Sequence, residues 1–272
     1  IEAPANYSIP GEFEERVFIA LTKIMKNNNY SRRFVVSASE ILETLGLTNF
    51  FYYKKIKDAL TLLSKTNYTF LNSLYSNKES GIIEKKIISS IMNITIISKK
   101  DSRAKEIEAF EDGRIKEVYE INFTDYFYEN IIRKGYLAFD SGKLLAIENS
   151  VSRAIYTIVE KWRGYDLYIK RQAFFIARRI PLKWDKTQIK RTIDTMEKAL
   201  IELRNLNLIK NYKIIKEKKW ELAEIEITYE ESHNKTKRDT FFTEKNEFNS
   251  MDMLVTSTEE KIKCISEDFQ SG

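Results

Sequence analysis

The side chains with the clearest capacity for chemistry lie near the start of residues 184–216. Lys186, Thr187, Lys190 and Arg191 combine basic and hydroxyl groups within six positions. Groups of these types hydrogen-bond to base edges in the grooves of a duplex and to phosphate oxygens. This cluster therefore fits contact with nucleic acid better than it fits bond-breaking chemistry.

A helix is expected to position these residues. The apolar residues that follow Asp185 recur at helical spacing and form one stripe: Ile189, Ile193, Met196, Leu200 and Leu203. The basic residues project from the opposite face, and Asp185 is predicted to cap the helix N-terminus. A β-rich segment, 208–216, comes next. A recognition helix followed by the first strand of a wing has this order.

The same pattern occurs once earlier in the chain. A shift of 140 positions superposes Ile56, Ala59, Leu60, Leu63 and Asn67 on Met196, Ala199, Leu200, Leu203 and Asn207. A chance match between two core-facing helices is the alternative, because any such helix carries this stripe. Two further helical stretches precede each copy, and a strand-like run follows each one. These features favour a duplicated domain, and we predict an α+β fold of two tandem winged-helix domains.

The predicted organisation has four parts. They are an N-terminal arm (1–11), a first winged helix for dimerisation and DNA contact (12–140), a second winged helix as the main DNA-binding domain (141–229), and an acidic, partly disordered tail (230–272).

Within the first domain, we expect helices at 11–26, 40–45 and 49–65, with Ser37 or Ser39 as the N-cap of the second. Strands 68–75 and 86–97 should form a hairpin whose connection, 76–81, is a wing. A mobile charged loop, a strand and a helix then occupy 98–113, 114–123 and 124–133. In the second domain, we expect helices at 144–162 and 172–179, strands at 166–170 and 220–229, and a second wing tip at 216–219.

The candidate DNA contacts fall into three groups. Thr187, Lys190 and Arg191 should reach base edges, together with Lys186 on the same helix face. Phosphate contacts are expected from basic residues around that helix, namely Lys170, Arg171, Arg178, Lys183, Lys216, Lys218 and Lys219. The first domain offers Asn49, Lys54, Lys55 and Lys57. The alternative for Arg191 is an ion pair with Asp194 or Glu197 on its own helix.

Charge and composition limit the classes of partner. The 272 residues carry a net charge of +5, yet residues 230–272 hold ten acidic and six basic residues, so the basic excess lies in the folded part. A polyanion attracts such a surface through counterion release, although a solvated basic face is the simpler alternative. No apolar run approaches the roughly 18 residues of a membrane span. One cysteine, Cys264, and the lack of a signal-peptide pattern indicate a reducing, cytoplasmic location.

The chain lacks the residues that enzymes of nucleic-acid metabolism need. It has one histidine, His233, and no phosphate-cradling GxxxxGK[ST] sequence. Rolling-circle initiators need a histidine cluster for their metal. We therefore expect neither enzymatic activity nor a cofactor or metal, and we expect His233 to be a surface residue in a mobile tail.

Residues 137–164, LAFDSGKLLAIENSVSRAIYTIVEKWRG, resemble plasmid replication initiators of the replication initiator protein A kind, in which a helix carries a run similar to Arg153-Ala154-Ile155-Tyr156. The resemblance extends over most of 12–229, and its motifs are mainly hydrophobic patterns. It implies tandem winged helices, binding to directly repeated origin sequences, a dimeric form and recruitment of host replication proteins. The high Lys, Asn and Ile content departs from that family and weakens residue-level transfer.

Two other functions fit the same pattern. A winged-helix transcription regulator would use the same DNA contacts, and replication of a plasmid that carries the cognate repeats would separate it from an initiator. A tandem winged-helix scaffold for a protein partner would be expected to be acidic over its folded part, which this chain is not. Salt dependence of duplex binding would test that scaffold hypothesis. A homodimer is expected through the strand and helix at 114–133.

Overall fold

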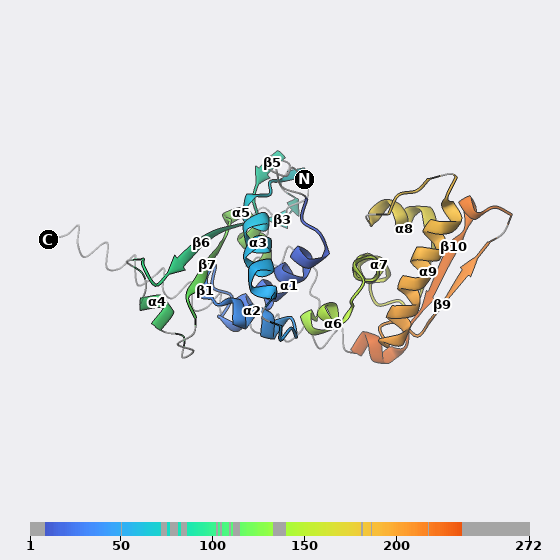
Figure 1. Cartoon of the computed structure of the whole chain (residues 1–272). Coiled ribbons are helices and arrows are strands. Elements are labelled where there is room, and N and C mark those ends of the chain that lie inside the picture. The colour runs from blue at the N-terminus through green and yellow to red at the C-terminus, as the bar shows by residue number, and fades with distance from the viewer. Residues whose placement is uncertain are drawn as a thin grey trace. The chain divides into compact units, whose positions relative to one another are not determined.

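The computed structural model describes residues 9–49, 51–71, 75–76, 81–82, 86–101, 103, 105–108, 110, 115–132, 140–180, 182–185, 187–216 and 218–235. The chain divides into unit 1, Ile1–Leu137, and unit 2, Ala138–Gly272 (Figure 1). This division lies close to the predicted boundary at 140. Both units mix helices with small antiparallel sheets, so the fold is α+β. Most of the predicted N-terminal arm and most of the predicted tail fall outside the described residues.

Unit 1 builds a helical layer on a three-stranded sheet. Its elements are α1 (Glu12–Asn27), β1 (Arg33–Val36), α2 (Ala38–Thr44), α3 (Tyr52–Lys65), β2 (Tyr68–Leu71), β3 (Tyr75–Ser76), β4 (Gly81–Ile82), β5 (Lys86–Ser89), β6 (Met92–Ser98), α4 (Lys105–Glu108), β7 (Glu117–Phe123) and α5 (Asp125–Ile132). The main sheet has the order β1-β7-β6, and β2 pairs with β5. The Ser37 hydroxyl accepts a hydrogen bond from the Glu40 amide, which confirms that cap.

The predicted strand 86–97 is wrong as a single element. β5 pairs with β2, whereas β6 pairs with β7 in the main sheet. The change occurs at Ser90 and Ile91, whose carbonyls both accept hydrogen bonds from the Thr124 hydroxyl. Isoleucines lie on both sides of Ser89 and Ser90, so the segment resembles one strand in sequence, and the long-range contact with Thr124 accompanies the break. Of the predicted wing at 76–81, residues 77–80 lie outside the described part.

Unit 2 contains the same core order as unit 1, namely helix, strand, two helices and two further strands of the main sheet. Its elements are α6 (Ser141–Ala146), α7 (Ser150–Arg163), β8 (Tyr168–Gln172), α8 (Ala173–Arg179), α9 (Ile189–Asn205), β9 (Asn211–Ile215), the 3₁₀ turn η1 (Trp220–Leu222) and β10 (Glu224–Thr228). The sheet has the order β8-β10-β9. In each unit the last strand of the main sheet therefore lies between the other two.

The predicted helix 144–162 is also wrong as one element, because the chain turns at residues 147–149. Asp140 caps α6, and the side chain of Asn149 accepts from the Val151 amide to cap α7. The Arg153 side chain is buried and donates to the carbonyls of Ile147 and Glu148. A buried guanidinium thus satisfies the backbone of the turn, which an amphipathic pattern alone does not reveal.

Two helix starts differ from the prediction. Asp185 does not cap α9 directly. Its carboxylate accepts from the amide and hydroxyl of Thr187, and the helix begins at Ile189. In unit 1, Asn49 accepts from the Phe51 amide in the same manner, and α3 begins at Tyr52 rather than at 49. Both side chains prefer such local turns to the first position of a helix.

The matched stripes of α3 and α9 face the cores of their units. Ile56, Ala59, Leu60 and Leu63 are at most 2% exposed, and so are Met196, Ala199, Leu200 and Leu203. The burial predicted from the 140-residue shift is therefore confirmed in both helices. Each helix consequently directs its polar face away from the core.

Ordered structure continues past residue 230, into the first part of the predicted tail. Residues 231–235 form a helical turn, and Asn234 is 2% exposed. The Asn234 carbonyl accepts from Arg163, and its amide donates to the Tyr165 carbonyl. His233 packs edge-on against the Tyr229 ring instead of lying free in a tail. These contacts fix the segment to the end of α7.

Candidate nucleic-acid interface

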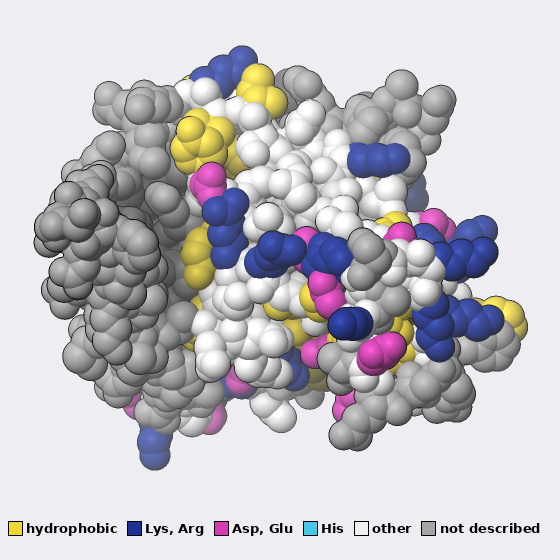
Figure 2. Space-filling view, turned by 90° about the vertical axis from the view of Figure 1, so that its left-hand side faces the viewer, with side chains coloured by type: hydrophobic (Ala, Val, Ile, Leu, Met, Phe, Trp, Pro, Cys, Tyr) yellow, Lys and Arg dark blue, Asp and Glu magenta, His cyan; other side chains and the backbone are white. Residues whose placement is uncertain are grey.

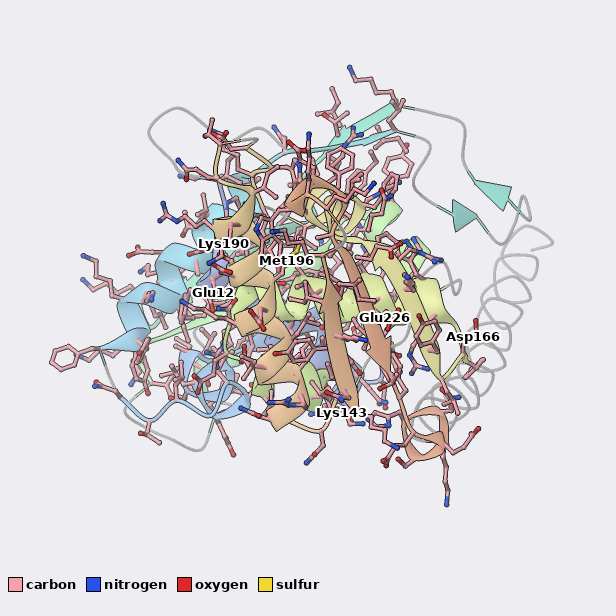
Figure 3. All side chains as sticks on the ribbon, turned by 90° about the vertical axis from the view of Figure 1, so that its right-hand side faces the viewer. Glu12, Lys143, Asp166, Lys190, Met196 and Glu226 are labelled. Carbon is pink, nitrogen blue, oxygen red and sulfur yellow. The ribbon has the colours of Figure 1, made fainter. Side chains whose placement is uncertain are left out.

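The polar face of α9 begins with Lys190 and Arg191, both exposed. Figure 3 labels Lys190 on α9, one turn and more ahead of Met196. The Lys190 ammonium lies 3.9 Å from the Asp194 carboxylate. The Arg191 guanidinium has no ion pair or hydrogen bond with any described residue. The alternative prediction paired Arg191 with Asp194, but it is Lys190 that forms this pair. Arg191 is therefore available to an external acceptor.

The turn before α9 orders a hydroxyl and a carboxylate. The Thr187 amide and hydroxyl donate to one Asp185 oxygen at 2.9 and 2.7 Å. The hydroxyl hydrogen bond, together with the amide hydrogen bond, lowers the pKa of Asp185 below its usual range. While this turn persists, the Thr187 oxygen can accept from a base amino group but its proton is engaged. Lys183 lies 3.9 Å from the same carboxylate, and Lys186 falls outside the described residues.

Lys170 is held within the sheet of unit 2. Its ammonium lies 2.7 Å from Glu224 and 3.5 Å from Glu226 on the neighbouring strand β10. The hydrogen bond to Glu224 raises the pKa of Lys170. Two carboxylates compete with any phosphate for this cation, so the structure disfavours the predicted phosphate contact. Arg171 is exposed, and its guanidinium donates to the Lys170 carbonyl.

The connection between β9 and β10 carries three exposed lysines. Lys216 lies 4.9 Å from the centre of the Trp220 ring, while Lys218 and Lys219 point into solvent. Arg178 on α8 is likewise exposed, 5.5 Å from the Phe174 ring. No carboxylate among the described residues forms an ion pair with these four cations. They are thus able to contact phosphates without losing an internal partner.

The first-domain candidates have more varied surroundings. Lys54 and Lys55 are exposed on α3, and the Lys55 ammonium lies 4.2 Å from the Phe13 ring. Lys57 forms a 2.8 Å ion pair with Glu117 on β7. Figure 2 shows Lys and Arg side chains beside Asp and Glu side chains over one face of the molecule. The cations of unit 1 are thus partly neutralised by neighbouring carboxylates.

A cavity of about 700 Å³ in unit 1 brings together residues that sequence reasoning did not connect. Its lining combines the start of α2, the polar face of α3 and the start of β7: Ser37, Ala38, Ser39, Tyr53, Lys54, Lys57, Ile115, Lys116, Glu117 and Tyr119. Lys116 is the cation that was missed. It lies about 60 positions from Lys57 in the chain, and no local pattern places it beside α3.

No protein-family model matches the chain, and no curated protein is similar to it in sequence. The fold is similar to the crystal structure of RctB domains 2-3 (RctB residues 155–483), with a TM-score of 0.54, 13% identity, and coverage of 85% of this chain and 87% of that one. A structure of selenomethionine derivatives of the same two domains gives a TM-score of 0.52 at 13% identity, with coverage of 82% and 83%. This likeness concerns the fold, and it spans both units.

Within the described ranges, no helix is both long enough and apolar enough to cross a membrane. The same part of the chain contains no group of three or more His, Cys, Asp or Glu side chains placed to hold a metal ion.

Proposed function

We propose that this chain is a replication initiator that binds double-stranded DNA sequence-specifically at repeated origin sites, as plasmid replication initiators do. The observation that carries the proposal is the similarity to RctB domains 2-3 over both units. RctB is a replication initiator of Vibrio chromosome II. Arg191 of α9 and the lysines of the β9–β10 connection form no ion pair with a described carboxylate, which agrees with such a role.

In this proposal each unit acts as a winged helix. The order of helices and strands and the central position of β7 and β10 suit that fold. α9 lies in the major groove with Arg191 on a guanine edge, and the β9–β10 connection reaches the adjacent backbone. α3 gives unit 1 a second, weaker contact. Two modules on one chain raise the effective concentration for the second contact at a repeated site.

The proposal also covers the location of the protein, its oligomeric state and its partners. The protein acts in the cytoplasm as a homodimer, recruits host replication proteins and has no enzymatic activity or cofactor of its own. Support comes from the resemblance of residues 137–164 to plasmid replication initiators. Metal-dependent cleavage of a supercoiled plasmid by the purified protein would contradict the non-enzymatic assignment.

Selection of bound sequences from a random duplex pool tests the central claim. We expect enrichment of one motif whose width matches two modules. A plasmid carrying the enriched repeats should then replicate only in cells that supply the protein, which separates an initiator from a transcription regulator. Enrichment without replication would favour the regulator, and no enrichment would remove the claim of sequence specificity.

The substitution Arg191→Ala is expected to weaken cognate duplex binding by about 1–3 kcal/mol and to relax the preference at one base position. The guanidinium has no described partner, so its loss removes a DNA contact without exposing another charge. Fluorescence anisotropy on cognate and scrambled duplexes measures the effect. Lys161→Ala on α7 removes a positive charge elsewhere in unit 2 and should change neither the affinity for the cognate duplex nor the base preference. Equal losses on both duplexes for Arg191→Ala would refute base reading.

Lys218→Ala should weaken binding to all duplexes alike and reduce the slope of log affinity against log salt by about one. The reason is that each phosphate neutralised by the protein releases about one counterion from the DNA. Lys170→Ala is the matched comparison, and it should leave the slope unchanged because Glu224 and Glu226 already neutralise that ammonium. Titrations at several salt concentrations give both slopes. Affinity that does not fall steeply with salt in the unsubstituted protein would favour a protein-binding scaffold.

A further inference from the structure

A polar pocket of about 330 Å³ lies in unit 2 where three chain segments meet. Its lining comes from α6, from the end of α9 with the turn after it, and from the segment beyond β10: Lys143, Arg204, Asn207, Ile209, Lys210, Glu230, Ser232 and His233. Three cations therefore face one carboxylate. None of these residues belongs to the candidate interface around the start of α9.

The His233 ring presents an unsatisfied nitrogen. Its Nδ1 atom lies 3.1 Å from the Glu230 amide nitrogen, which donates to it, and 3.2 Å from the Glu230 carbonyl oxygen, to which it would donate in the other tautomer. The ring packs edge-on against Tyr229 at 5.7 Å. A neutral imidazole that accepts at Nδ1 carries its hydrogen on Nε2. The Nε2 atom is buried and has no hydrogen-bond partner among the described residues. Buried ring nitrogens are rarely left unpaired, so this one indicates a missing hydrogen-bond partner, which is an acceptor when Nδ1 accepts from Glu230.

The cations of the pocket are not needed to cap α9. The last turn is closed by backbone hydrogen bonds, with the amides of Leu206 and Leu208 donating to the carbonyls of Glu202 and Leu203. Asn207 adopts a positive φ of 54°, which allows this closure. Arg204 lies 5.6 Å from the Tyr212 ring. Among the described residues, Lys210 is the one cation of the pocket that forms an ion pair, at 3.4 Å from Glu230. The pocket thus keeps a positive excess.

We propose that this pocket binds a phosphate group. Arg204, Lys143 and Lys210 supply the charge, and His233 lines the same pocket with a ring nitrogen that has no partner among the described residues. Such a combination suits tetrahedral oxyanions. Figure 3 places Lys143 at the far end of the α9 ribbon from Lys190. A helix of 17 residues spans roughly 25 Å, so this site is separate from the base-reading end. The phosphate belongs either to a small free molecule or to a nucleic-acid backbone.

Because His233 is the single histidine of the chain, its imidazole resonances identify it without assignment. Titration of the full chain with inorganic phosphate should shift these resonances along a saturable curve. Chloride added to the same ionic strength should leave them in place. Equal shifts with both salts, or no shift with phosphate, would overturn the proposal.

Substitutions distinguish phosphate bound in this pocket from a general effect of salt on the charged surface. Arg204→Gln should raise the dissociation constant for inorganic phosphate about tenfold, and Lys143→Gln, on another helix, should act in the same direction. Lys161→Gln, at an exposed position of α7, should have no effect. Circular dichroism checks that each variant is folded. Unchanged phosphate binding in both pocket variants would refute the site.

Duplex binding by the same variants identifies the source of the phosphate. If the ligand is a free molecule, Arg204→Gln leaves duplex affinity unchanged. If it is a backbone phosphate, the variant weakens duplex binding and inorganic phosphate competes with the duplex. Either result supports a phosphate site. The site does not depend on the proposed function, since phosphate binding can be present when sequence-specific DNA binding is absent, and the reverse.

Discussion

Replacing Arg163 by Met is expected to destabilise unit 2 by about 3–5 kcal/mol, because it leaves a carboxylate buried without its counter-ion. The Arg163 and Glu160 side chains are 1% and 5% exposed, and two hydrogen bonds of 2.7 and 2.9 Å join them. Arg163 also donates to Asn234 and lies 3.9 Å from the Tyr229 ring. The substitution therefore also releases the segment after β10. Urea unfolding followed by tryptophan fluorescence measures the loss.

The double variant Arg163→Met with Glu160→Gln provides the control. Removing both charges avoids the lone buried carboxylate while keeping an acceptor on residue 160, so much of the lost stability should return. A coupling free energy obtained from the two single variants and the double variant isolates the pair. A loss below about 1 kcal/mol for Arg163→Met would show that water reaches Glu160 and that the pair is not buried in solution.

Leu200→Ala should cost unit 2 about 2–5 kcal/mol, and Leu60→Ala should cost unit 1 a similar amount, because each leaves a cavity at the centre of a buried stripe. All three tryptophans, Trp162, Trp184 and Trp220, pack against the core of unit 2. Tryptophan fluorescence therefore follows unit 2, whereas circular dichroism follows both units. Leu200→Ala should shift the fluorescence transition to lower urea, and Leu60→Ala should shift only a part of the dichroism transition.

Ile201→Ala is the matched control for the second prediction, since it removes a branched side chain that is 36% exposed from the same helix. Its effect should be well below that of Leu200→Ala. A fluorescence transition that moves equally with Leu60→Ala and Leu200→Ala would show that the two units unfold together, and the idea of two separately cooperative units would then be abandoned.

Local features of the molecule were accessible from the sequence. The buried faces of α3 and α9 follow from apolar residues at helical spacing, and the Ser37 cap follows from a hydroxyl before a helix with Glu40 three positions on. The first residues of helices were harder to predict from the sequence. Asp185 and Asn49 lie where a cap is expected, but each forms a local turn, and the helices begin later. Such choices differ by little free energy, and packing decides them.

The sequence by itself determined the α+β pattern, the repeated stripes and the basic excess of the folded part, because periodicity and charge are properties of neighbouring positions. Only the tertiary structure decided which cations are free. Lys57 and Lys170 appear equivalent to Arg191 in sequence, yet Glu117 and Glu224 neutralise them across strands that lie more than 50 positions away along the chain. Strand register sets the Lys170 pair and the break at Ser90. The packing of helices against their neighbours sets the Lys57 pair and the meeting of Lys143, Arg204 and His233. Register depends on the summed burial of whole strands, which no local window contains.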